Sequence, residues 1–245
     1  MATEYQITIT MPDNTVTALT ENGFSLYALL AVQSSAEGSP VVWYRTNDFA
    51  LATAISWSDN YQAYTSRSPI IQSGTITAGA AYPATVGQTL SITNPMAIGE
   101  VSQSTGTGPE LSGITFINQT STQFTCGITL QQPTGSFGPI CAFPLFGNNM
   151  DIIVPTQRVF LMFSSLAVPT GSVIEQAYGP GILIDMTGVT TQTVSYDINL
   201  GWSWAGGASW AQAYPPNQNL APLLVRPGAA PGSPLSTQPA RRTHA

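Results

Sequence analysis

The chain has 245 residues, of which 43% are hydrophobic and only 7% are charged, and its net charge at pH 7 is −6. The charged fraction is far below the roughly 25% typical of globular domains, so Ser, Thr, Asn, Gln and Gly are expected to cover the surface. All six basic residues are Arg, and three of them lie in the last twenty residues. The rest of the chain lacks the basic patch that binds nucleic acids or anionic membranes, so we expect no nucleic-acid partner.

The low charge also bears on self-association. Repulsion between like-charged surfaces is one of the forces that keep the β-sheets of different molecules apart. With twelve carboxylates and six arginines in the whole chain, that repulsion is weak. A homo-oligomer is therefore one expectation for this protein.

The first residues, MATEYQITITMPDN, contain neither the basic segment nor the apolar segment of a secretory signal peptide. No apolar run in the sequence approaches the length of a transmembrane helix. We therefore expect a cytoplasmic protein without a transmembrane segment, with export by a non-classical route as the alternative.

The N-terminal part of the chain has clear periodic signals. Strict alternation of apolar and polar residues over 4–11 predicts a half-buried strand. One short helix is expected over residues 13–22, with Asp13 as its cap and Gly23 at its end. A hairpin that turns on Asn22 and Gly23 is the alternative. Residues 24–32 are apolar on both faces, which is typical of a central strand.

Along the rest of the chain, apolar segments recur about every ten residues, with Gly, Pro and Asn between them, which is typical of a sandwich or barrel. We predict an all-β protein, an antiparallel β-sandwich of two packed sheets with about 10–14 short strands. A single domain is expected over residues 1–226. A flexible Pro/Gly-rich tail is expected over residues 227–245.

Aromatic residues suggest two places for ligand contacts. Residues 43–64 are expected to form a pair of neighbouring strands, in which Trp43 and Trp57 anchor the core. The turn residues that remain are candidate ligand contacts, and so are two tryptophans before a Gly206–Gly207 hairpin turn. These candidate ligand-binding residues are Asp59, Asn60, Tyr61, Trp202 and Trp204.

Catalytic chemistry has little support in this sequence. The single histidine is His244, so the body of the chain has no histidine for Ser-His-Asp or Cys-His catalysis or for a histidine metal site. Asp48 and Asp59 are a candidate carboxylate pair, but both occur in Asx turn sequences that need no further explanation. We predict no catalytic residue, no metal site and no cofactor.

The two cysteines, Cys126 and Cys141, lie symmetrically about Pro133 and Thr134, so a hairpin turning there would place them opposite one another. A cross-strand disulfide at a close pair would contribute about 3 kcal/mol. The expected cytoplasmic location favours two buried free thiols instead. The sequence leaves both alternatives open.

An aromatic strand in residues 26–66 leads to a W-S-x-x-Y segment. The residues of this pattern are Tyr27 to Leu30, Val41 to Arg45, Ile55 to Tyr61, and Tyr64. Over about residues 26–66 the pattern resembles the rhizosphere-expressed protein RhiA family. The resemblance implies a bacterial accessory protein of β-sandwich type and supplies no catalytic residues.

The function that we expect is that of a non-catalytic accessory protein that binds a ligand or self-assembles. The first alternative is a carbohydrate-binding, lectin-like module that uses Trp, Tyr and Asp side chains at strand ends. The second alternative is a membrane-active, toxin-like protein. The expected partners are thus a second copy of the chain or a carbohydrate.

Overall fold

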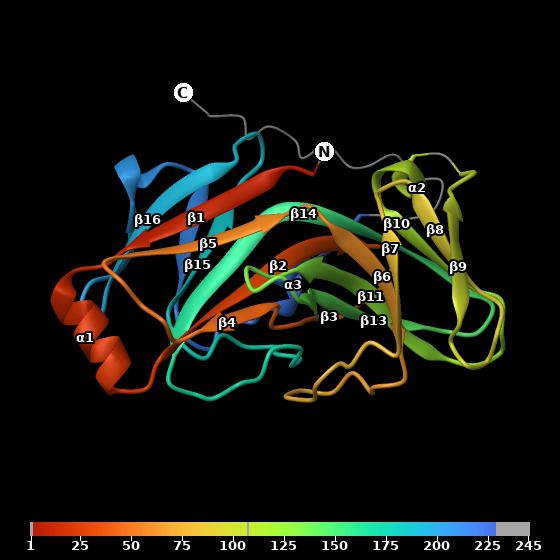
Figure 1. Cartoon of the computed structure of the whole chain (residues 1–245), viewed down its shortest axis with the longest axis horizontal. Helices are drawn as coiled ribbons and strands as arrows, with labels where there is room; N and C mark the ends of the chain where they lie inside the picture. Colours follow the sequence, from red (N-terminus) through yellow and green to blue (C-terminus); the bar gives the residue numbers. More distant parts are fainter. Residues whose placement is uncertain (1, 107, 229–245) are drawn as a thin grey trace, which may run out of the picture.

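The computed structural model describes residues 2–106 and 108–228 (Figure 1). These residues form 19 β-strands, three short α-helices and one 3-10 helix, arranged as sheets packed on one another. The prediction of an all-β sandwich is confirmed. Residues 229–245, which make up most of the predicted tail, lie outside the described residues.

One sheet contains, in this order, β17 (Gly201–Trp204), β16 (Thr191–Asp197), β1 (Glu4–Thr10) and β5 (Ala52–Ser58). It lies at the upper left in Figure 1. The predicted alternation holds in β1, where Tyr5, Ile7 and Ile9 are buried and Glu4 and Gln6 are exposed. This four-stranded sheet therefore has one core face and one solvent face.

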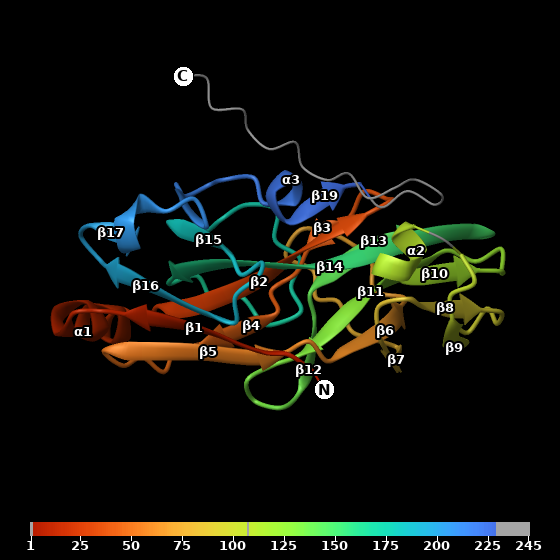
Figure 2. The same cartoon turned by 90° about the horizontal axis from the view of Figure 1, so that it is seen from above.

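The largest sheet has nine strands. They are β18 (Ala211–Tyr214), β15 (Gly181–Asp185), β14 (Asn149–Ser164), β10 (Ile114–Asn118), β8 (Gln88–Ile92) and β9 (Gly99–Gln103), with β2 (Ser25–Ser34), β4 (Tyr44–Thr46) and β19 (Val225–Pro227) attached through β2. β14 arches across the whole molecule (Figures 1 and 2). One half of β14 pairs with β15 and the other half pairs with β10, while β2 runs beside both halves.

The third sheet has six strands: β3 (Ser39–Pro40), β13 (Cys141–Leu145), β11 (Phe124–Gln131), β6 (Tyr61–Ser66) and β7 (Ala80–Ala84), with β12 (Phe137–Pro139) paired to β11. It adjoins β10 of the nine-stranded sheet, where Asn118 Nδ2 donates to the carbonyl of Leu145 at 3.4 Å. The four-stranded sheet packs on the other half of the nine-stranded sheet, where Phe163 of β14 stacks on Trp202 of β17. The sandwich therefore has a different second layer at each end.

The core occupies both faces of the nine-stranded sheet. Alternate residues of β2, such as Leu26 and Leu30, join the main cluster between the sheets. Tyr27 and Leu29 point the other way, into a second cluster that includes Leu220 and the C-terminal helix α3 (Ala221–Leu224). The apolar run in β2 is thus buried on both sides, as predicted for a central strand.

The predicted N-terminal helix is present as α1 (Asp13–Glu21), and Gly23 has a φ of 65° after its end. Asp13 is not the cap, which corrects that prediction. Pro12, in extended conformation, is the N-cap residue and Asp13 lies in the first turn, where a carboxylate favours the helix dipole. Two further short elements are α2 (Pro109–Ser112) and the 3-10 helix η1 (Ala205–Gly207).

The strand number and pairing differ from the expectation of two antiparallel sheets with 10–14 strands. Nineteen strands form three sheets, and β1–β16, β8–β10 and β2–β19 are parallel pairs. The reason is that the chain leaves one sheet for another at several turns, which divides the apolar segments into shorter strands. Pro227, the first residue of the predicted tail, pairs with Ser34 in β19.

Candidate functional site

Asp59 and Asn60 lie where the chain passes from one sheet to another. β5, before them, pairs with β1, whereas β6, after them, pairs with β11 and β7. The strands around Trp43 and Trp57, which were predicted to be neighbours, are not paired, because β4, directly after Trp43, pairs with β2, so that prediction is wrong. Asp59 Oδ1 accepts a hydrogen bond from the backbone N–H of Thr3 at 2.6 Å, which holds the corner against the N-terminal strand.

Tyr61 borders a cavity of about 10 Å³, which has room for no more than about one water molecule. Tyr5 and Trp57, also in its lining, stack with ring centroids 5.5 Å apart. Burial, and then the charge of Asp59, raise the pKa of Tyr61, so its hydroxyl stays protonated at neutral pH. The three predicted residues at this corner are half-buried or exposed, but they surround no ligand-sized hollow.

Trp202 and Trp204 lie at the other end of the four-stranded sheet. Trp202 is only 8% exposed and its Nε1 donates to the carbonyl of Pro180 at 3.0 Å. Trp204 is half-buried and its Nε1 donates to the carbonyl of Ala208 at 2.8 Å. Both indole N–H groups are thus engaged within the protein. The structure does not bring these tryptophans together with Asp59, because the corner lies at the Glu4 end of β1 and Trp202 lies beyond its Thr10 end.

The hairpin expected around Gly206 and Gly207 is also wrong in its pairing. Both glycines have positive φ, as the turn requires, but β17 pairs with β16 and β18 pairs with β15. The rings of Trp202, Phe163 and Tyr196 all contact one another, with centroids 4.5–5.4 Å apart. These aromatic side chains belong to the core under β17. After β17 the chain crosses to the nine-stranded sheet, where it forms β18.

The two cysteines are free thiols and both are fully buried. The hairpin turns near the expected place, but Cys126 pairs with Phe143, and the N–H of Ile140 bonds to the carbonyl of Ile128. The hairpin is centred on Thr134, and the register shifts by one further residue between β12 and β13, so direct opposition of the thiols is a wrong prediction. Burial raises the pKa of Cys141 to about 12, which makes this thiol a poor nucleophile.

A groove of about 1040 Å³ opens over the six-stranded sheet, away from all the predicted ligand contacts. Its lining comes from the segment after β6, from the start of β11, from β13 and from the loop before β3. The lining includes Glu37, Arg67, Ile70, Gln123, Phe124 and Pro144.

Core packing and hydrogen bonds hold the base of the groove, and its walls are polar. Phe124 is 3% exposed and packs in the main core. Thr125 Oγ1 donates to the carbonyl of Ser68 at 2.7 Å and so ties the segment after β6 to β11. Arg67 Nη2 donates to the carbonyl of Pro95 at 2.7 Å, which holds the guanidinium at the rim. Glu37 and Gln123 are exposed.

The charges in the groove balance, since Glu37 and Arg67 are the charged residues of its lining. Among the residues that the structure describes, no group of three or more His, Cys, Asp or Glu side chains is arranged to hold a metal ion. Within the same residues, no helix has the length and hydrophobicity needed to cross a membrane. The groove is suited to hydrogen bonding with a polar molecule of low net charge.

No protein-family model, curated protein or solved structure matches this chain. The likeness to the RhiA family over residues 26–66 therefore stays a prediction. The groove residues were missed because polar residues beside strand ends are common in any β-protein. Arg67 is the one signal that was available, as one of only six basic residues in the sequence.

Proposed function

We propose that this protein is a non-catalytic binding protein and that the groove over the six-stranded sheet is its ligand site. The observation that supports this most is the combination of size and chemistry in the groove. Its volume of about 1040 Å³ is at the upper end of the range of ligand pockets. Arg67 supplies donors, Glu37 supplies acceptors and Gln123 supplies both.

An uncharged molecule rich in hydroxyl groups, such as an oligosaccharide, fits this lining best. Each sugar hydroxyl both donates and accepts, so it needs mixed partners of the kind that Glu37, Arg67 and Gln123 provide. The C–H faces of a sugar need apolar contacts, and Ile70 and Pro144 lie in the same lining. The lectin-like alternative therefore places the carbohydrate in the groove and not at the tryptophans and Asp59.

A glycan array followed by titration calorimetry tests this proposal. We expect Arg67→Ala to weaken binding of the best glycan at least about tenfold, because a hydrogen bond from a charged donor contributes about 1.5–3 kcal/mol. Arg67 is exposed, so the variant is expected to fold.

Arg45→Ala is the matched control, because Arg45 is also exposed but its guanidinium bonds to Ser25 in β2, outside the groove. Equal losses in the two variants would point to overall charge instead of the groove. An array without hits for the unmodified protein would contradict a carbohydrate ligand.

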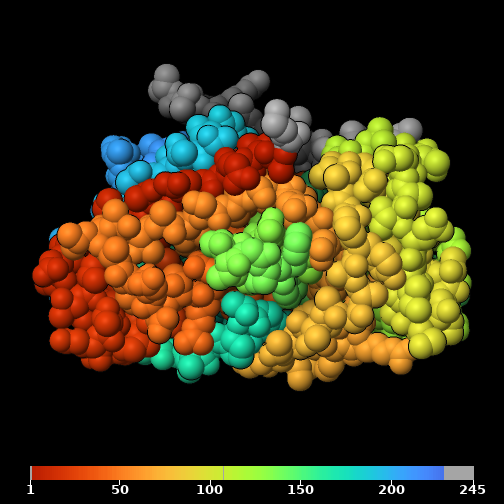
Figure 3. All heavy atoms as spheres, viewed as in Figure 1, coloured from red at the N-terminus to blue at the C-terminus, as the bar shows by residue number. Residues whose placement is uncertain are grey.

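We also infer self-association, because β5 is an unprotected edge strand. It has seven residues and, among the described residues, pairs only with β1. Edge strands usually carry charged residues, proline or bulges that prevent pairing with another molecule. The exposed side chains of β5 are instead Ala52, Ala54 and Ser56, and the orange segment that includes it lies at the surface in Figure 3.

A second copy would pair with β5 in antiparallel fashion about a two-fold axis at Ile55. Such an interface is isologous, and Ala54 of one copy would lie opposite Ser56 of the other. Ala54→Lys is expected to raise the dimer dissociation constant at least about tenfold, because it places two cations near the axis.

Sedimentation velocity over a range of concentrations measures this effect. Thr8→Lys is the control, since Thr8 pairs with Ala54 but lies on the central strand β1. Thr8→Lys should leave the dimer intact if the edge forms the interface. A protein that stays monomeric at every concentration would contradict self-association, and equal disruption by both variants would move the interface to the sheet face.

A further inference from the structure

Two arginine side chains lie on the same face of the nine-stranded sheet, on the side opposite its main core. Arg226 of β19 pairs with Gln33 of β2, and Gln33 follows Ala31 on the face that carries the second core cluster. Arg158 of β14 shares this face with Phe160, which belongs to the same cluster. Since directly paired residues and alternate residues share a face, both arginine side chains lie on it. The residues that the structure describes include only four arginines, so the presence of two of them on one face needs an explanation.

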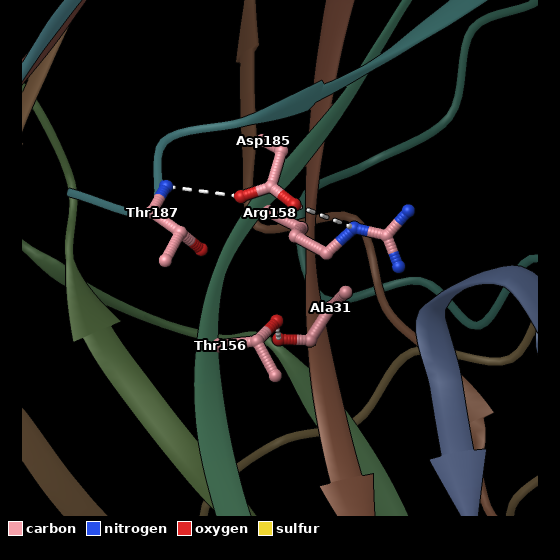
Figure 4. A network of polar contacts seen from close by, with 5 residues as sticks. All are labelled: Ala31, Thr156, Arg158, Asp185 and Thr187. Carbon is pink, nitrogen blue, oxygen red and sulfur yellow. Dashed lines mark hydrogen bonds and ion pairs between the residues drawn. The ribbon is translucent and has the colours of Figure 1, made fainter. Parts of the chain in front are cut away.

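Arg158 lies in a bulge of β14, between Pro155 and Val159, where the pairing with β2 shifts. A bulge redirects the side chains that it contains. Figure 4 shows the guanidinium of Arg158 extending away from Asp185 and past Ala31, toward the side on which the blue C-terminal strand lies. The small side chain of Ala31 occupies little of the space over β2.

The guanidinium of Arg158 is poorly satisfied. Its Nε and Nη1 atoms are buried and have no hydrogen-bond partner among the described residues. The nearest carboxylate oxygen, Asp185 Oδ2, is 3.8 Å from Nε, which is too long for a hydrogen bond. Asp185 is 41% exposed at its side chain and its other oxygen accepts from the N–H of Thr187 at 2.9 Å. A buried cationic donor without an acceptor is costly, so an acceptor is expected at this place.

The charge balance points the same way. Burial, followed by the positive charge of Arg226, lowers the pKa of Arg158, while Asp185 and Tyr214 act in the opposite direction. The positive charges of the two guanidinium groups repel each other. An anion between the two guanidinium groups would remove that repulsion and supply the missing acceptors together.

We propose that Arg158 and Arg226 form a binding site for one tetrahedral oxyanion, a phosphate or sulfate group. Two guanidinium groups on different strands approach an anion from different directions, and a tetrahedral group presents oxygens to both. A carboxylate has only two oxygens and one negative charge, so it is expected to bind two guanidinium groups more weakly. This site lies on the nine-stranded sheet, whereas the groove lies over the six-stranded sheet. A negative result for one site therefore leaves the proposal for the other unchanged.

Calorimetric titration of the full chain with inorganic phosphate, sulfate and acetate at constant ionic strength tests the site. We expect phosphate and sulfate to bind and to raise the melting temperature by mass action, and acetate to bind at least about tenfold more weakly. O-phosphoserine distinguishes a free ion from a phosphomonoester: tighter binding than inorganic phosphate identifies the group as part of a larger ligand, and weaker binding identifies the free ion.

Arg226→Gln is the main variant, because Arg226 is only half-buried and the change is expected to leave the fold intact. It should lower the affinity for phosphate at least about tenfold. Arg45→Gln is the control and should bind phosphate as the unmodified protein does. Unchanged phosphate affinity in Arg226→Gln, equal loss in both variants, or tighter binding of acetate than of phosphate would each overturn the proposal.

Discussion

Trp43→Ala is expected to lower the free energy of unfolding by about 3–5 kcal/mol, the range for removing a buried tryptophan. Trp43 is fully buried, and its Nε1 donates to the carbonyl of Leu130 in β11 at 3.1 Å. Its backbone N–H bonds to the carbonyl of Ala28 in β2, and its ring meets the edge of Trp57 in β5 with centroids 6.0 Å apart. Trp43 therefore joins all three sheets, through its backbone to β2 and through its side chain to β5 and β11, and removal of the side chain leaves a cavity where the sheets meet.

Denaturant unfolding followed by far-UV circular dichroism measures the loss, because this signal does not depend on the tryptophan that is removed. Trp43→Phe, which keeps part of the ring, should cost less than Trp43→Ala. Trp204→Ala is the positional control, since Trp204 lies half-buried at the edge of the core. If Trp43→Ala cost no more than Trp204→Ala, the central role of Trp43 would be refuted.

A pH-dependent part of the stability is expected from Asp151, which is 2% exposed inside the sandwich. Burial raises the pKa of Asp151, although hydrogen bonds from the hydroxyls of Ser35 and Ser34 and from the N–H of Ile152 partly oppose this. Because the folded-state pKa exceeds the unfolded value of about 3.9, the folded protein binds the proton more tightly. This contribution to stability is complete below the unfolded pKa and is lost as the pH rises through the folded pKa.

The measurement is the free energy of unfolding against pH for the unmodified protein and for Asp151→Asn. The difference in the free energy of unfolding between the unmodified protein and Asp151→Asn should change with pH in the window that begins near pH 4 and ends above the raised pKa. As the pH rises through this window, the unmodified protein should lose stability relative to the variant. A tenfold difference in proton affinity between the folded and unfolded states corresponds to about 1.4 kcal/mol.

Asp48→Asn serves as the control for this profile, because Asp48 is exposed in the loop before β5. This variant gives the pH dependence that replacing an exposed carboxylate produces, which is subtracted from the Asp151→Asn profile. A flat corrected difference for Asp151→Asn, or one of the opposite sign, would show that burial does not control the protonation of Asp151.

Local periodicity predicted the elements whose burial follows directly from their own residues. The alternation in β1, the two-sided apolar run in β2 and the short helix α1 are all present. The expectation that Trp43 and Trp57 anchor the core is confirmed by exposures of 0% and 7%. These features depend on which side chains avoid water, and that is a property of each short segment.

Strand partners were harder to predict, because a partner is chosen by packing between segments far apart in the chain. β5 and β6 are consecutive and joined by two residues, yet they lie in different sheets. The same is true of β17 and β18, despite two glycines with the conformation that suits a hairpin. Turn chemistry shows that the chain bends there, but the core decides which sheet the next strand joins.

The candidate sites differ from the sequence expectation for the same reason. Asp59 and Tyr61 form a corner beside a cavity too small for a ligand, and Trp202 packs in the core. The groove around Arg67 and the pair formed by Arg158 and Arg226 draw on segments with no sequence pattern in common. The sequence has few cations, so each arginine is unusual. Only the positions of these arginines in the fold suggest the ligands that we propose for them.

The sequence by itself thus determined the all-β class, the helix α1, the central position of β2 and the core role of Trp43, because hydrophobic periodicity is local. Only the tertiary structure decided the division into three sheets, the shifted register of Cys126 and the convergence of Arg158 with Arg226. Those features arise from long-range packing and from a bulge in β14, and both depend on where distant segments meet.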